Sequence, residues 1–513
     1  MRLQGVMQPL KDNMKFKSIT EKISEKTFPI NIYGISESGK SYIINGIFEE
    51  NDNSMVVVTH SDVDAKNLYE DLSFYTTDVF YFPVREVVFY NVDAISGDLR
   101  WARLKVIKEI LQNERKKIIV TSIDALTSLY TPKEYYLRYS MIIKTGDDID
   151  LKEISKSLLQ CGYERVEVVE GKGEFSFRGG ILDVFPPTSA YPYRVELFGD
   201  EVDSIRTFNT ESQRSIEKVE EFSIFPSKEV IVDDECRSRA VQNINEELKK
   251  VIANVSKENK ESVEKIKGIV GKNIELLNNT YYFETIDSYL PFFYEKLDSF
   301  FDYLQGYTFV VDDFKRSSGK MESIYYEFNE NYMSFLQRGD ILPSQNSLLL
   351  NKGELESKLE NSSLITLSSF LNKSDGLFNT VDIGFEEVTL NKYNGQLNML
   401  IEDIQERKEK KYKTVILAGT RPRGERLVKT LMEKGIFSTY KDSIDKIEAG
   451  EVVITFGNLL RGFDYPELEL SIISDKDIFG ETWRKRSGKA VRKKGVAKIT
   501  SFAELKPGDY VVH

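Results

Sequence analysis

The sequence predicts an α/β protein: a domain built on a parallel sheet, a small β-rich domain inserted in it, and a second, small α/β domain after it. Three observations support this fold class. Short apolar runs alternate with helical stretches in residues 1–146, strands and turns dominate residues 160–228, and strand–helix alternation returns after residue 381. Alternating strands and helices are typical of parallel sheets with crossover helices, whereas strands joined by tight turns form antiparallel hairpins.

The first part of the chain supplies the expected strands and helices of the parallel sheet. The expected strands are FPINIYG (28–34), MVVVTH (55–60), VFYFP (79–83) and KKIIVTS (116–122). Between them, residues 41–50, 62–75 and 99–112 show the apolar spacing of helices.

The character of the sequence changes after Lys144-Thr145-Gly146. The runs RVEVVE and EFSF, separated by Gly171-Lys172-Gly173, predict one hairpin, and YRVELF and EVDSIRTF, separated by Gly199-Asp200, predict a second. Residues 233–278 are rich in lysine and glutamate at helical spacing, which predicts a solvated helical hairpin.

The later part of the chain returns to α/β patterning. YTFVVDDF (307–314) is its clearest strand, and TVILAG (414–419), ERLVKTLMEKG (425–435) and EVVITFG (451–457) predict a strand, a helix and a strand. Residues 483–498, WRKRSGKAVRKKGVAK, hold eight basic residues and no acidic one. Such a run predicts a linker, with binding of DNA or phosphate as the alternative.

Composition narrows the function classes. The 513 residues suffice for three or four domains, and the net charge of −12 means that any contact with DNA needs a local basic patch. Two cysteines and two histidines argue against a disulfide framework, a Cys-rich zinc site or a His-dependent triad, so we expect no metal site. The low cysteine count fits a reducing cytosol, and no apolar run approaches the roughly 18 residues of a membrane span, so we expect a cytoplasmic protein without membrane contact.

One motif carries recognisable chemistry. Residues 34–41, GISESGKS, fit G-x-x-x-x-G-K-[ST] at every fixed position, with a predicted strand before them and a helix after them. In such a loop Gly34 and Gly39 let backbone N–H groups curl around phosphate oxygens, Lys40 reaches the β- and γ-phosphates, and the Ser41 hydroxyl ligates Mg²⁺. ATP and Mg²⁺ are therefore candidate ligands of this loop.

Hydrolysis requires further groups. Asp312, in the strand 307–314, is the candidate acid near the metal. No Glu-x-His pair follows it, and the sequence shows no second nucleotide domain with an obvious arginine finger, so we expect no catalytic residues and no turnover by this chain alone. The alternative for residues 34–41 is a loop that keeps its shape without binding nucleotide.

Six segments carry a family resemblance. They are GYER…GEFSFRGGILDVFPP (162–187), YRVELFGDEVDSIR (193–206), TESQRS (210–215), IFP (224–226), DIFG (477–480) and ELKPGDYVVH (504–513). The first four resemble the UvrB-like N-terminal module of bacterial transcription-repair coupling factors. The last two resemble the beginning of that family's RNA-polymerase-interacting domain, which favours this family over UvrB itself.

The resemblance covers essentially the whole chain and implies its domain organisation. The core would be a UvrB-like, RecA-type parallel sheet domain. The implied domains are 1–146 (domain 1A, with the phosphate loop), 147–228 (domain 2, β-rich and UvrA-binding), 229–380 (domain 1B, which completes the α/β core), 381–480 (domain 3, small α/β), 481–503 (basic linker) and 504–513 (truncated start of the RNA-polymerase-interacting domain).

The resemblance also implies a docking site for UvrA, the damage-recognition ATPase, on domain 2. The matching arginines are Arg165 and Arg178, and a third arginine of UvrB falls on Ser176. Phe177 and Phe185 are candidate apolar anchors, with core packing as the alternative for both.

The residues alone leave the arrangement of these arginines open. A two- or four-residue turn around residues 171–173 would put Arg165 and Arg178 on one face, whereas a three-residue turn would separate them. Arginine is enriched at interface centres, and the alternative is that Arg165 pairs with a local acid such as Glu164 or Glu167.

The family's role then gives the expected function. Full-length members use ATP-driven translocation on double-stranded DNA to displace stalled RNA polymerase, and this module recruits UvrA for nucleotide excision repair. The expected partners are UvrA, RNA polymerase through the segment truncated here, and double-stranded DNA in the full-length protein, whose motor would lie beyond residue 513. The alternatives are a nucleotide-binding or ATPase module that acts on DNA, and UvrB itself, against which the short segment 81–91 argues.

Overall fold

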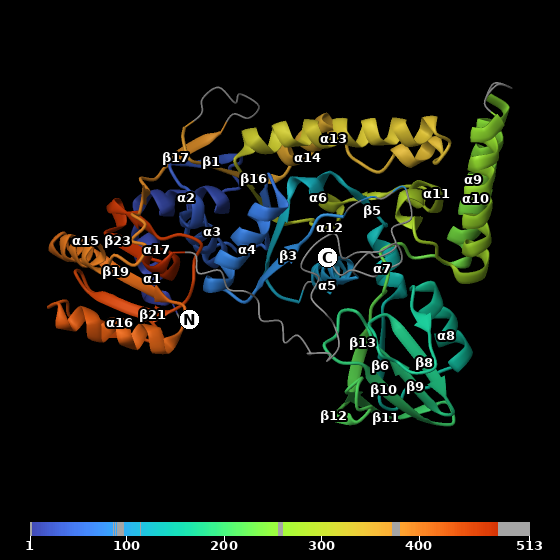
Figure 1. The fold of residues 1–513 in the computed structure, drawn as a ribbon, viewed down its shortest axis with the longest axis horizontal. Helices are drawn as coiled ribbons and strands as arrows, with labels where there is room; N and C mark the ends of the chain where they lie inside the picture. Colours follow the sequence, from blue (N-terminus) through green and yellow to red (C-terminus); the bar gives the residue numbers. More distant parts are fainter. Residues whose placement is uncertain are drawn as a thin grey trace, which may run out of the picture.

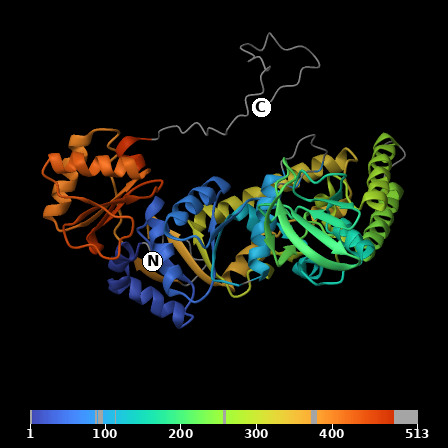
Figure 2. The same cartoon turned by 90° about the horizontal axis from the view of Figure 1, so that it is seen from below.

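The computed structural model describes residues 3–85, 87, 89, 97–112, 114–254, 260–371 and 380–480. It confirms the predicted fold class: a parallel sheet lies at the centre, the β-rich insert and a helical hairpin lie at one end, and the C-terminal α/β unit lies at the other (Figure 1). Figure 2 shows the same order from below. The predicted linker (481–503), the segment 504–513 and part of the segment 81–91 lie outside the described residues.

The central sheet has seven strands, all paired in parallel, in the order β17-β1-β16-β15-β2-β4-β3. Its strands are β1 (Ile30–Tyr33), β2 (Met55–Thr59), β3 (Val79–Phe82), β4 (Ile118–Ser122), β15 (Thr308–Asp312), β16 (Ser363–Ser368) and β17 (Val381–Gly384). Strands β2, β4 and β15 are buried along their whole length, as strands covered on both faces must be. The four strands expected before residue 123 and the strand expected at 307–314 all belong to this sheet.

The helices of the core lie before, between and after the sheet strands along the chain. They are α3 (Glu37–Glu50), α4 (Asp62–Tyr75), α5 (Asp98–Gln112), α6 (Ile123–Thr127), α7 (Lys133–Tyr139), α12 (Phe300–Tyr303), α13 (Phe314–Gln337) and α14 (Lys352–Glu360), and α1 (Gln4–Asp12) and α2 (Met14–Ser24) precede the first strand. The short strands β5 (Leu129–Tyr130) and β14 (Asp298–Ser299) pair beside them. Within the described residues, no helix combines the length and the apolar character needed to cross a membrane.

The insert is a six-stranded sheet in the order β12-β11-β10-β9-β8-β7, covered by α8 (Leu151–Gln160). Its strands are β7 (Glu164–Arg165), β8 (Glu174–Arg178), β9 (Ile181–Val184), β10 (Tyr193–Phe198), β11 (Glu201–Phe208) and β12 (Ser215–Val219). The hairpin predicted at Gly199-Asp200 is confirmed as β10–β11. A pair of strands, β6 (Met141–Lys144) and β13 (Glu221–Ile224), connects the insert to the rest of the chain.

The prediction of a hairpin around residues 171–173 is wrong. Strand β7 runs parallel to β8, and β8 instead forms its hairpin with β9. The chain between β7 and β8 makes a wide loop because Val166 and Val169 pack against Phe185 and Phe208. The carboxylate of Glu174 accepts hydrogen bonds from two backbone N–H groups of this loop and holds it open.

Two long helices, α9 (Asp234–Asn254) and α10 (Lys260–Thr280), form the helical hairpin predicted over 233–278. It is less solvated than predicted, because one side of it belongs to a core cluster with η1 (Ile286–Tyr289), α11 (Leu290–Phe293) and residues near η2 (Pro343–Asn346).

The C-terminal unit is a six-stranded sheet in the order β18-β22-β23-β19-β21-β20. Its elements are β18 (Val388–Thr389), α15 (Leu397–Glu409), β19 (Lys413–Ala418), α16 (Arg421–Glu433), β20 (Thr439–Tyr440), β21 (Val452–Phe456), β22 (Phe463–Tyr465), η4 (Pro466–Leu468), β23 (Leu470–Ile473) and α17 (Asp475–Phe479). The strands and helix predicted at 414–419, 425–435 and 451–457 are confirmed. One hydrophobic cluster joins this unit to the central sheet through residues such as Ile47, Val415 and Tyr465.

Candidate functional site

The two predicted docking arginines lie at the edge of the insert sheet. Arg165 ends the edge strand β7 and is exposed, and the side chain of Arg178 at the end of β8 is 49% exposed. The register pairs Arg165 with Phe175, an odd number of positions from Arg178. Because side chains alternate along a strand, the two arginines leave the sheet on opposite faces. A partner that contacts both must therefore reach around the free edge at β7.

A buried carboxylate orients one of these arginines. Asp183 on β9 is 1% exposed, and its Oδ2 accepts a hydrogen bond from Arg178 Nη2 at 3.1 Å. The same carboxylate accepts hydrogen bonds from Arg194 Nε at 2.7 Å and Arg194 Nη2 at 2.8 Å. The guanidinium of Arg194 also lies over the ring of Phe208, 4.4 Å from its centroid. Asp183 and Arg194 were missed from the sequence; an acid in the middle of the apolar strand ILDV was the available signal.

The surroundings of Arg165 are different. Among the described residues Arg165 forms no ion pair, so neither Glu164 nor Glu167 neutralises it. The backbone carbonyl of Glu167 accepts a hydrogen bond from the buried hydroxyl of Ser176.

Both candidate phenylalanine anchors pack inside the insert. Phe185 is 8% exposed in the small cluster with Val169 and Phe208. Phe177 is half-buried, with its ring 5.8 Å from that of Phe175, and it packs against the core of the insert. The structure thus presents the arginines to solvent and turns the phenylalanines toward their own domain.

The phosphate loop joins β1 to α3 as the motif predicts, and the structure brings its lysine to the predicted acid. Lys40 Nζ lies 2.6 Å from Asp312 Oδ1, at the carboxyl ends of the sheet strands, and both side chains are largely buried. The hydroxyl of Ser41, the expected ligand of Mg²⁺, donates a hydrogen bond to the Ser38 carbonyl at 2.6 Å.

A carboxyl group from the loop after β17 fills the space above Gly39. Glu387 accepts hydrogen bonds from Ser36 N at 2.7 Å, Ser36 Oγ at 2.9 Å and the Tyr465 hydroxyl at 3.2 Å. A Cβ atom added at Gly39 would lie 2.1 Å from Glu387 Oε2. Burial raises the pKa of Glu387 to about 7, and its three donors and Lys40 oppose this rise. The place that the motif reserves for a phosphate therefore holds an acid of the same chain.

A second set of contacts covers the same loop. Asp71 on α4 accepts hydrogen bonds from the Ser38 hydroxyl at 2.6 Å and from Leu460 N at 2.7 Å. Arg461 donates its backbone N–H to the Ser38 hydroxyl and its Nε to Glu37. Burial raises the pKa of Asp71 to about 6. In this arrangement Glu387 and Asp312 hold the groups that the motif would offer to a nucleoside triphosphate. Within the described residues no cluster of three or more acids, histidines or cysteines could hold a metal ion.

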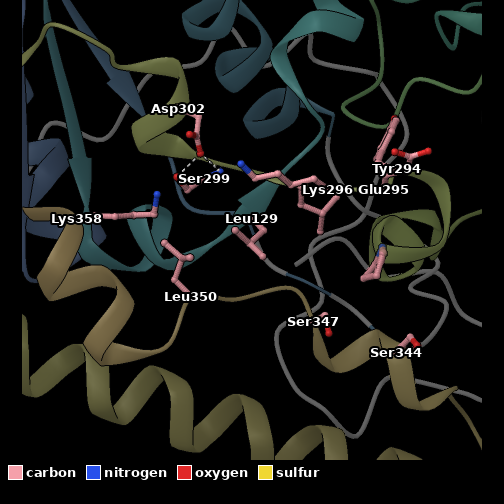
Figure 3. Close-up of a pocket in the computed structure, with 12 residues that line it drawn as sticks. Leu129, Tyr294, Glu295, Lys296, Ser299, Asp302, Ser344, Ser347, Leu350 and Lys358 are labelled. Carbon is pink, nitrogen blue, oxygen red and sulfur yellow. Dashed lines mark hydrogen bonds between the residues drawn. The ribbon is translucent and has the colours of Figure 1, made fainter.

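A separate cavity of about 500 Å³ opens beside β5, between α12 and η2 (Figure 3). Lys296 and Lys358 reach its rim, and Asp302 accepts hydrogen bonds from the backbone and hydroxyl of Ser299 to cap α12. None of the residues predicted from the sequence lines this cavity.

Comparison with known proteins places these features in a class. Residues 141–230, which include the whole insert sheet, match the family model of the UvrB interaction domain. The insert is therefore similar to a UvrB interaction domain, and it is attached to a parallel α/β core.

Longer similarities narrow this class. The chain is 30% identical over 515 residues to the transcription-repair-coupling factor of Bacillus subtilis (strain 168), covering 100% of this chain and 43% of that protein. It is 27% identical over 508 residues to that of Staphylococcus epidermidis (strain RP62A) and 27% identical over 486 residues to that of Staphylococcus aureus (strain MRSA252), covering 42% and 41% of those proteins. The chain is thus a relative of the transcription-repair-coupling factors, as the resemblance predicted, and it spans less than half the length of the relatives it matches.

Proposed function

We propose that this chain recruits UvrA to stalled RNA polymerase in nucleotide excision repair, as part of a cytoplasmic transcription-repair coupling factor. The observation that carries the proposal is the exposure of Arg165 and Arg178 at one sheet edge inside the matched UvrB interaction domain. Guanidinium groups at an open edge can pair with carboxylates of a partner, and arginine is enriched among residues that dominate binding energy. Contacts with RNA polymerase and double-stranded DNA, and ATP-driven translocation, belong to the proposed role of the whole coupling factor.

Titration of UvrA tests this proposal. We expect Arg165→Ala with Arg178→Ala to weaken UvrA binding by about 2–4 kcal/mol, because truncation of central interface arginines removes charge-assisted contacts. Arg115→Ala is the matched control, since its side chain is 54% exposed in the α5–β4 connection and pairs with Asp78 outside the insert. Unchanged UvrA affinity in a folded double variant would refute the docking site.

A second candidate function is ATP–Mg²⁺ binding at the phosphate loop. The pairing of Lys40 with Asp312 favours it, because these are the lysine and acid that such sites use around a γ-phosphate. It requires Glu387 to leave the loop first. Equilibrium dialysis with ATP–Mg²⁺, with Lys40→Ala as the negative variant, measures this function.

A further inference from the structure

The approach of Glu387 to the loop begins in the central sheet. Strand β17 lies parallel to β1, and the pairing continues past both strand ends: Phe385 N donates to the Tyr33 carbonyl at 2.9 Å and Glu387 N to the Gly34 carbonyl at 3.2 Å. Gly34 has a φ of +78°, and a Cβ there would lie 1.9 Å from the Phe385 carbonyl oxygen. The first glycine of the motif thus admits the chain's own backbone.

The groups that the loop would offer to a phosphate already have internal partners. Ser36 N and Oγ donate to Glu387, Lys40 pairs with Asp312, and the Ser41 hydroxyl donates to a backbone carbonyl. The second glycine, Gly39, leaves room for the Glu387 carboxyl group. Both glycines of the motif are therefore used for close approach by residues 385–387.

The carboxyl contact is one part of a larger attachment. The Tyr465 hydroxyl, which donates to Glu387, also contacts the Gly39 carbonyl oxygen at 3.1 Å, and the Tyr465 ring stacks on Tyr42 of α3 with centroids 5.9 Å apart. Asp71 and Ser38 bind the backbone of residues 460–461. These contacts join residues 387, 460–461 and 465 to the phosphate loop, α3 and α4.

We propose that Glu387 is a built-in substitute for a phosphate, through which the phosphate loop fastens the C-terminal α/β unit to the central sheet. A polyphosphate and Glu387 then compete for one place above Gly39, so binding of a polyphosphate at the loop requires the 385–387 segment to withdraw. This proposal does not rest on UvrA docking, which concerns the opposite end of the molecule.

Calorimetric titration tests this competition with two probes, ATP–Mg²⁺ and inorganic tripolyphosphate. We expect Glu387→Ala to bind at least one probe ten-fold or more tighter than the wild-type chain, and we expect Lys40→Ala in the same background to abolish that gain. A gain in affinity for tripolyphosphate identifies the phosphate chain as the recognised group. A gain in affinity for ATP–Mg²⁺ alone shows that the nucleoside contributes to binding. Both outcomes support the proposal. Equal affinity of the wild type and Glu387→Ala for both probes would overturn it.

The neighbouring acid supplies the matched control. Glu386 is exposed, and within the described residues no hydrogen bond or ion pair joins its carboxylate to the loop, so Glu386→Ala should bind both probes as the wild type does. If Glu387→Ala does not fold, Glu387→Gln keeps the shape of the side chain and removes only its charge. A gain of about three-fold is expected for Glu387→Gln, and no gain in that folded variant also overturns the proposal.

Discussion

The edge of the insert and the phosphate loop both carry groups that can bind an acid, but only those of the insert edge face solvent. Arg165 is exposed and unpaired among the described ion pairs, and half of the Arg178 side chain faces solvent. The phosphate loop matches its motif at every fixed position, but Glu387 and Asp312 occupy its binding groups. The difference teaches that the quality of a motif does not determine whether the site it describes is free.

The origin of the acids explains this difference. Arg178 is oriented by Asp183, only five residues away on the neighbouring strand, so the acid stays beneath the arginine and leaves its outer side free. The loop is filled by acids that lie 272 residues from Lys40 and 351 residues from Ser36. A local partner orients Arg178, whereas long-range partners close the loop.

The largest expected effect follows from removing the acid beneath the arginines. Asp183→Ala leaves Arg194 without its two charge-assisted hydrogen bonds in a largely buried position. We expect the free energy of unfolding to fall by about 3 kcal/mol, because breaking a buried ion pair leaves an uncompensated charge. Urea unfolding followed by circular dichroism measures this change.

Asp200→Ala is the control for this variant, since Asp200 is exposed in the β10–β11 turn of the same domain. A loss below 1 kcal/mol for Asp183→Ala would show that the arginines are positioned without this carboxylate. In that case Asp183 would not orient the arginines, and its contrast with Glu387, which occupies the phosphate loop, would no longer hold.

A smaller effect should appear as a dependence of stability on pH. The pKa values of Glu387 and Asp71 are raised to about 7 and about 6 from ordinary values of 4.5 and 3.8, in both cases mainly by burial. The folded chain therefore binds more protons than the unfolded chain between about pH 4 and pH 7. Stability from these groups is complete below their unfolded pKa values and is lost as the pH rises through their folded ones.

We expect the free energy of unfolding to fall by roughly 1–2 kcal/mol from pH 5.5 to pH 7.5 through Glu387. The groups that contribute at the two acids are Ser36, Tyr465 and Lys40 at Glu387, and Ser38, the Leu460 N–H, Lys476 and Glu70 at Asp71. Urea unfolding at the two pH values measures the fall, and Glu387→Gln should reduce it. An identical fall in Glu387→Gln would mean that the carboxyl group titrates normally and is not enclosed by the loop.

The sequence predicted those features whose cause is local. Continuous apolar runs such as MVVVTH marked strands buried on both faces, and Gly199-Asp200 marked a real hairpin turn. The motif predicted a loop between a strand and a helix, which β1 and α3 confirm, but it did not predict that Lys40 pairs with Asp312, 272 residues away. By contrast, the loop 166–173 looked like a hairpin turn, since nothing local shows that Val169 packs on Phe208.

Glu387 was beyond prediction for a physical reason. It stands in the segment GFEEVT beside a second acid, Glu386, with no pattern that separates the two. Only the parallel pairing of β17 with β1 decides which of them reaches Ser36 and which remains exposed. Long-range strand register, rather than residue type, selects the acid that fills the loop.

The smallest expected effect tests how far the open surface extends. Phe198 is 83% exposed at the tip of the β10–β11 hairpin, and the hydrogen bond from Leu197 N to the Gly180 carbonyl at 2.7 Å places this tip beside the turn after Arg178. We expect Phe198→Ser to change the free energy of unfolding by less than about 0.5 kcal/mol, because an exposed ring loses little packing. We expect it to weaken UvrA binding by about 1 kcal/mol, as aromatic residues beside an arginine contribute to interface centres.

Ile216→Ser is the control, since Ile216 is 49% exposed on β12, the edge strand at the other side of the insert sheet. Titration of UvrA against both variants separates a local contact of Phe198 from a general effect of making the surface more polar. Equal UvrA affinity of both variants and the wild type would confine the docking surface to the β7 edge.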